Sequence, residues 1–359
     1  MKTMKIVSVL AVFILAQALT LGAQTTTPKP AAKKPAAKAA AKKPAAKPAA
    51  KPAPKPAAPA AQPAAKPASQ QDNFEAAAAK LKSNDVSERR QGAEMIAQSR
   101  NAKGAPALMA ALEDESPAVR QAAADALGLL TWREASPKLA LLLAEDKDPA
   151  VRQQAAISLS YIMDQASGPA LVKALKDSEP SVAYSALHTL SVLKYAPAEE
   201  QIAGLLGSKD ANMRRGAIAA LGNLKAAKSG AAIVSALSDE DRFVRTEAIK
   251  AIGNIPYEAG APELVKLLDK EQQPAVRVEA ALALSKMGRN DGLLTAYEFL
   301  RAPELSVRSQ SLTVLASVGD SRSLQLIEEM IAADPDSADK GMLEYARQRL
   351  QARLKTATK

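Results

Sequence analysis

A repeat of 31 or 32 residues restricts the fold of this chain more than any other feature of its sequence. An arginine, usually preceded by valine, recurs from Arg89 to Arg308 in steps of 31, 32, 31, 31, 31, 32 and 31 residues. Ala183 occupies one of the eight positions in place of arginine. Repeats of this length are typical of solenoids, in which each unit buries its apolar face against its neighbours.

Helix-boundary signals recur at fixed distances from the arginine position. A polar or acidic residue suited to capping a helix N-terminus lies four residues before it. Proline, which fits the first helical position, follows the cap in four units. The capping residues are Asp85, Ser116, Asp148, Glu179, Asp210, Asp241, Gln273 and Glu304, and the prolines are Pro117, Pro149, Pro180 and Pro274.

An alanine-rich helix of about ten residues follows each cap, and we expect Gly128, Gly222 and Gly253 to end three of these helices. A second proline, as in Pro106 or Pro262, then begins a shorter helix. The apolar stripe of the long helix is too narrow to fold alone. The sequence therefore predicts an all-α solenoid of about eight to nine helix pairs over residues 72–356.

Residues 114–128 (DESPAVRQAAADALG) and 146–156 (DKDPAVRQQAA) resemble the HEAT repeat of the short, phycobilisome-lyase-like class, the E–Z type. The resemblance extends over residues 80–345. It implies a structural ladder in which arginines and aspartates of adjacent repeats pair. The arginines are Arg120, Arg152, Arg214, Arg245, Arg277 and Arg308, and the aspartates are Asp114, Asp146, Asp177 and Asp239.

Residues 1–23 match a secretory signal peptide. Lys2 and Lys5 precede an apolar run from Ile6 to Ala16, and small residues favour cleavage after Ala23. The alternative is an uncleaved membrane anchor, because the 18 residues from Ile6 to Ala23 reach the lower limit of a spanning helix. Either interpretation predicts an exported chain that is periplasmic or secreted by a bacterium.

Residues 24–71 are almost wholly alanine, lysine and proline, with ten lysines and no acidic residue. Proline breaks helices and like charges repel, so we expect a disordered, extended linker. It is either a spacer or an electrostatic contact to an anionic envelope polymer or lipid. Residues 72–359 carry 36 basic and 38 acidic residues, which disfavours nucleic acid as a partner of the folded part.

Few catalytic arrangements are open to this sequence. It has no cysteine and one histidine, so we predict no catalytic, metal or cofactor site and no enzymatic activity. The resemblance includes enzymes, but its di-iron hydroxylases need several His-Glu pairs, its lyases act in the cytoplasm and its DNA glycosylases need a basic surface. A HEAT-like lyase-type enzyme is therefore the third alternative for function.

Partner binding is predicted on the face of the long helices that points away from their apolar stripe. At 100° per residue, positions two, three and six after the valine face outward, and in HEAT-type solenoids this is the concave surface. Side chains typical of a binding hot spot gather there in three consecutive units. They are Gln153, Gln154, Ile157, Tyr184, His188 and Arg215. The alternative is an ordinary solvated surface, with His188 as a surface histidine rather than a ligand or base.

Trp132, Tyr195 and Tyr257 lie twelve residues after the arginine position in alternate units. They are expected either to cover the seam between helices or to form an aromatic edge for a peptide or glycan. We predict an extracytoplasmic scaffold or adaptor that binds an unidentified protein through the concave face. The alternative is a cell-envelope or polyanion attachment protein that acts through its cationic linker.

Overall fold

The computed structural model describes residues 70–270, 272–335 and 337–357, which belong to one compact unit. The predicted signal peptide and all but the last two residues of the predicted linker lie outside these ranges. Every element of the described ranges is an α-helix or a short 3-10 helix. In this part of the chain, no helix is both long and apolar enough to cross a membrane.

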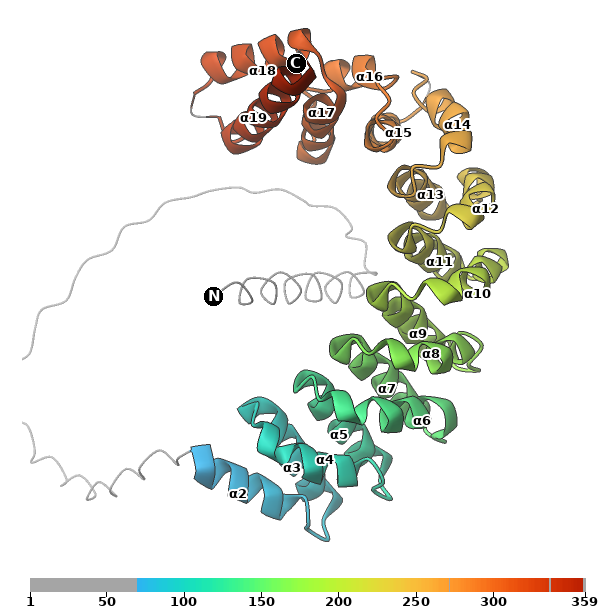
Figure 1. Ribbon diagram of the computed structural model, residues 1–359, viewed down its shortest axis with the longest axis vertical. Helices are drawn as coiled ribbons and strands as arrows, with labels where there is room; N and C mark the ends of the chain where they lie inside the picture. Colours follow the sequence, from blue (N-terminus) through green and yellow to red (C-terminus); the bar gives the residue numbers. More distant parts are fainter. Residues whose placement is uncertain (1–69, 271, 336, 358–359) are drawn as a thin grey trace, which may run out of the picture. The chain divides into compact units, whose positions relative to one another are not determined.

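Eighteen α-helices, α2 to α19, form nine pairs in the described residues, which confirms the predicted all-α repeat fold. One layer holds α3 Val86–Ser99, α5 Pro117–Leu129, α7 Pro149–Ile162, α9 Pro180–Leu193, α11 Ala211–Leu224, α13 Arg242–Asn254, α15 Pro274–Lys286, α17 Leu305–Val318 and α19 Lys340–Ala357. The other holds α2 Gln70–Lys80, α4 Ala105–Ala111, α6 Ser136–Glu145, α8 Gly168–Ala174, α10 Glu199–Gly204, α12 Gly230–Ser235, α14 Ala261–Lys266, α16 Leu293–Glu298 and α18 Ser321–Ala333. Figure 1 shows the two layers side by side along the array.

All eight predicted capping residues precede the long helices α3 to α17. Four of them accept backbone N–H hydrogen bonds through their side chains, and all four are aspartates. They are Asp85, Asp148, Asp210 and Asp241. A short carboxylate reaches the first amides of the helix and also interacts favourably with its dipole, so aspartate is the effective cap in these turns.

Small side chains hold the long helices close together. The alanine four residues after each valine position is fully buried in six units: Ala123, Ala155, Ala186, Ala217, Ala248 and Ala280. One buried apolar cluster extends from Ala77 to Leu284, and a second extends from Ala281 to Leu350. Helix α15 contributes to both, so the core is continuous along the array.

The three glycines expected to end helices do not do so. Gly128, Gly222 and Gly253 lie inside the last turns of α5, α11 and α13, where they are buried. A Cβ atom on Gly253 would lie only 2.7 Å from the Cα atom of Ala283 in α15. These glycines are therefore needed for close approach of the next helix, and the prediction that they act as C-caps was wrong.

Left-handed residues other than glycine end four of the long helices. Arg100, Met163, Lys194 and Lys225 have φ between 51° and 61° at the C-caps of α3, α7, α9 and α11. Such residues cost more in this conformation than glycine does. The sequence signal for a helix end is consequently weak in these repeats.

We expect Gly253→Ala to destabilise the fold by about 1–3 kcal/mol, because the new methyl group overlaps the backbone of α15. Gly204→Ala is the matched control, since its new methyl group would meet no neighbouring element within 4 Å and alanine favours helix. Urea denaturation measures both. Equal stability of the two variants would contradict the close-approach role of Gly253.

Candidate functional site

Arginine–aspartate pairs connect successive repeats along one edge of the array. Between the long helices α5 and α7, the Arg120 Nε and Nη2 atoms each lie 2.7 Å from a carboxylate oxygen of Asp146. Arg152 contacts Asp177 and Arg214 contacts Asp239 in the same bidentate way, at 2.8 Å for every bond. We call each such pair a rung, and for Arg120, Arg152 and Arg214 the rungs are the arginine–aspartate pairs that the resemblance implied.

Each rung also binds backbone on both sides. The Arg152 Nη1 donates to the carbonyl oxygen of Asp146 at 2.9 Å, and so ties down the loop that precedes its own helix. The partner carboxylate of Asp177 accepts the backbone N–H of Glu179 at 2.9 Å, which shapes the next loop. One guanidinium therefore links a loop, a long helix and the following loop.

The rungs vary toward the C-terminus. Arg277 pairs with Glu298 of α16 rather than with a loop aspartate, and Arg308 pairs with Asp339. Arg245 donates to the carbonyl oxygens of Asp239 and Glu240. Arg89, at the start of the series, binds Asp114. The ladder thus changes geometry where the second core cluster begins.

The pairing changes the acidity of the rung carboxylates. The hydrogen bond from the Arg152 guanidinium lowers the pKa of Asp177 more than partial burial raises it. Asp114 and Asp239 have lowered pKa values for the same reason. For Asp146, burial is the largest influence and raises the pKa, but the hydrogen bonds of Arg120 and the loop amide outweigh it.

The rung between α9 and α11 is absent. Ala183 takes the place of the arginine, and Ser208 takes the place of the aspartate. The Tyr184 hydroxyl instead donates to the Asp210 carboxylate, which caps α11. Burial and this hydrogen bond raise the pKa of Tyr184 to about 12.

The six side chains of the predicted binding face divide into two groups. Gln154 and Tyr184 are half-buried and bonded within the array, because Gln154 Nε2 donates to Asp125 at 2.9 Å and Tyr184 binds Asp210. The helical angle of Tyr184 predicted that its side chain points into solvent, and this prediction was wrong because the hydroxyl binds Asp210. Ile157 is also half-buried.

Gln153, His188 and Arg215 keep their polar atoms free of bonds to other described residues, and they lie on α7, α9 and α11. His188 and Arg215 are exposed and Gln153 is half-buried. Neighbouring groups nevertheless desolvate the imidazole and lower the pKa of His188. Three consecutive long helices thus each carry one polar side chain that makes no hydrogen bond to another described residue.

The aromatic side chains of the alternative site cover helix seams. Tyr195 lies against Gly168 at the start of α8, where a Cβ atom would overlap its ring, and Tyr257 lies against Gly230 of α12 in the same way. Trp132 is half-buried against the apolar core. The seam interpretation is the one that these contacts support.

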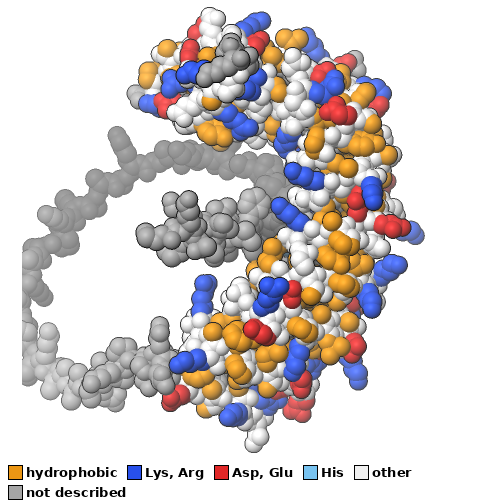
Figure 2. Space-filling view, in the orientation of Figure 1, with side chains coloured by type: hydrophobic (Ala, Val, Ile, Leu, Met, Phe, Trp, Pro, Cys, Tyr) orange, Lys and Arg blue, Asp and Glu red, His pale blue; other side chains and the backbone are white. Residues whose placement is uncertain are grey.

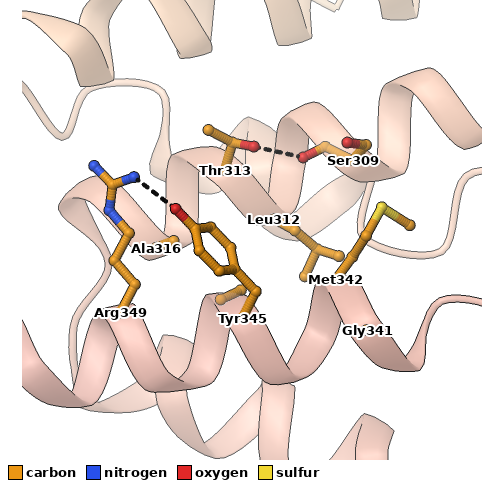
Figure 3. A pocket seen from close by; sticks show the side chains of 9 residues that line it. Ser309, Leu312, Thr313, Ala316, Gly341, Met342, Tyr345 and Arg349 are labelled. Carbon is orange, nitrogen blue, oxygen red and sulfur yellow. Dashed lines mark hydrogen bonds between the residues drawn. The ribbon is translucent and has the colours of Figure 1, made fainter. Parts of the chain in front are cut away.

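A hollow of about 300 Å³ lies between α17 and α19 (Figure 3). Leu312, Met342 and Tyr345 line it, and Arg349 Nη1 donates to the Tyr345 hydroxyl at 3.4 Å. Tyr345 is 63% exposed. The sequence interpretation missed this place because α19 carries no valine–arginine pair.

The chain matches the family of HEAT repeats over residues 74–160, 136–207, 198–285 and 261–346. It belongs to the HEAT-repeat family. These matches cover most of the array, and they agree with the resemblance noted in residues 114–128 and 146–156.

Comparison with other structures gives matches of low sequence identity. The complex of CpcE and CpcF of phycocyanin lyase from Nostoc sp. PCC7120 is 24% identical, covers 73% of this chain and 100% of that chain, and has a TM-score of 0.41. The Escherichia coli protein YibA is 21% identical over 75% of this chain and 99% of its own, with a TM-score of 0.50. A chain in a homology model of the full-length AP-3 complex is 17% identical over 75% of this chain and 55% of its own, also with a TM-score of 0.50. No curated protein matches the sequence.

Replacing a rung arginine and its exposed neighbour gives a matched test of position. Arg214→Ala removes both bonds to Asp239 and leaves that carboxylate without its partner, so we expect a midpoint temperature lower by roughly 5 °C. Arg215→Ala, at the exposed next position, should change it by about 1 °C or less. Thermal melts followed by circular dichroism check both. If Arg215→Ala lowered the midpoint temperature more than Arg214→Ala does, the buried face would have been assigned wrongly.

Acid should weaken the rungs in a defined direction. Because the pKa of Asp177 is lower in the folded chain than in the unfolded chain, its ionised form contributes stability above its unfolded pKa of about 3.9. That contribution is lost as the pH falls through the lower folded value. Asp177→Asn should thus weaken the fold at pH 7 and flatten the decline in stability below about pH 4. Urea midpoints between about pH 2 and 7 measure the slope, and an unchanged slope would contradict the pairing.

Proposed function

We propose that this protein is a protein-interaction scaffold or adaptor that acts outside the cytoplasm. The observation that supports it is the set of Gln153, His188 and Arg215 on the exposed side of α7, α9 and α11. An array of stacked repeats offers an extended surface for a partner. Arginine is among the residue types enriched where binding energy concentrates.

Binding is favoured over catalysis on chemical grounds. The sequence has a single histidine and no cysteine, so neither a thiol nucleophile nor a multi-histidine metal site can be assembled from it. Among the described residues, no group of three histidine or acidic side chains is placed to hold a metal ion. Figure 2 shows basic and acidic side chains interspersed over the drawn face of the array, which suits a mixed polar partner surface.

Attachment to the cell envelope through the linker is the second candidate. Residues 24–71 carry ten lysines and no acidic residue, and such a segment is attracted to anionic polymers and lipids. In this proposal residues 1–23 direct export and are removed after Ala23. The two candidates differ in which segment holds the partner.

Co-purification from the native envelope fraction distinguishes them. We expect the full chain to capture a protein partner. We also expect the intact mass of the exported protein to match a chain that begins at Gln24. Gln153→Ala with Arg215→Ala should weaken capture by about 2 kcal/mol or more, roughly thirtyfold, without changing the melt. Arg301→Ala, another exposed arginine, is the control.

Deleting residues 24–71 gives the opposite test. If the chain without residues 24–71 still captures the partner, this result supports binding of the partner at the face of α7, α9 and α11. Capture that survives the face substitutions, is lost with the linker and falls steeply with salt would replace the scaffold proposal by the envelope-attachment proposal. An uncleaved chain in the cytoplasm would contradict export.

A further inference from the structure

The α9–α11 junction lacks both halves of the rung found at the junctions on either side. Arg152 binds Asp177 between α7 and α9, and Arg214 binds Asp239 between α11 and α13. At the equivalent positions between α9 and α11 the chain has Ala183 and Ser208. Two complementary groups are therefore missing at one place.

Loss of the guanidinium also removes two hydrogen bonds to the loop before α9. In the preceding repeat, Arg152 Nη1 donates to the carbonyl oxygens of Asp146 and Lys147. Ala183 has no group that can donate to the equivalent carbonyl oxygens of Asp177 and Ser178. The loop before α9 is consequently held by the Arg152–Asp177 rung and by the bond from the Glu179 N–H to Asp177, with no guanidinium from its own long helix.

The following loop keeps its turn but loses its cross-link. Ser208 Oγ accepts the backbone N–H of Asp210 at 3.2 Å, as the Asp239 carboxylate does for Asp241 at 2.9 Å. Serine can form that turn, but it cannot accept a bidentate arginine. Local structure is thus preserved, while the bidentate pair between the repeats is lost.

One hydrogen bond takes the place of the rung. The Tyr184 hydroxyl donates to the Asp210 carboxylate, which at the same time accepts the Asn212 amide at 2.8 Å. A single bond from a tyrosine restrains the angle between two helices less than a planar bidentate pair does. Helices α9 and α11 also pack on each other less extensively than α7 packs on α9 or α11 on α13.

We propose that the α9–α11 junction is the joint at which this array bends, with α2 to α9 and α11 to α19 as two stiffer arms. A solenoid in which each repeat contacts only its neighbours opens first at its weakest interface. The joint lies between His188 and Arg215. A partner that contacts both residues would bridge the two arms.

Hydrogen exchange of the full chain alone, without a partner, tests the joint. Exchange protection should be about threefold to tenfold lower in residues 176–183 than in the equivalent residues 145–152, and lower by a similar factor in residues 205–213 than in the equivalent residues 236–244. Tyr184→Phe removes the bond that stands in place of the rung, leaves the bond from Asn223 Nδ2 to Ser191 Oγ between the same helices, and should lower protection further at this junction only. Equal protection at all three junctions, or no effect of Tyr184→Phe, would overturn the proposal.

Building the missing rung gives the converse experiment. Ala183→Arg with Ser208→Asp should raise protection at the α9–α11 junction to the level of its neighbours. Ala183→Gln with Ser208→Asn is the uncharged control of similar size and should not. Arg152→Ala should create the same loss of protection between α7 and α9. If the designed rung prevents folding, the Tyr184→Phe and Arg152→Ala results still decide the proposal, because both variants only remove side-chain groups.

Discussion

The bidentate pair between an arginine and the aspartate of the next repeat is the interaction on which the order of this array depends. Stacked alanines and leucines bury the apolar stripe, but apolar contacts are not directional and permit helices to slide. The guanidinium fixes two loops and one helix in a single geometry, with every bond between 2.7 and 2.8 Å in the central rungs. Such pairs set the register of the repeats more than they add stability.

Much of the fold could be predicted because its signals are local and periodic. The capping residues, the first-turn prolines and the buried alanines each follow from the 31-residue spacing, and the structure places them as expected. The helix ends were less predictable. Gly253 resembles a C-cap in the sequence, whereas its place is determined by how near α15 lies, and only the assembled structure shows that distance.

The candidate site was also predictable only in part. Helical angle alone predicted that Tyr184 and Gln154 face solvent, yet both reach across to a neighbouring repeat. A long side chain on a packed helix row can bond to the next helix, and its angle on its own helix does not reveal this. Arg215 and His188 are exposed as their helical angles predicted.

The interchangeability of the central rungs has a consequence for how a gene of this kind changes length. Arg120 and Arg152 present the same donors to Asp146 and Asp177 at matching distances. Recombination that removes or duplicates one whole unit there would rejoin an arginine to an equivalent aspartate, leaving no mismatched seam. A deletion that joins Val182 directly to Arg214 would remove both Ala183 and Ser208 and leave a continuous ladder, so a single event of this kind could also erase the irregular junction.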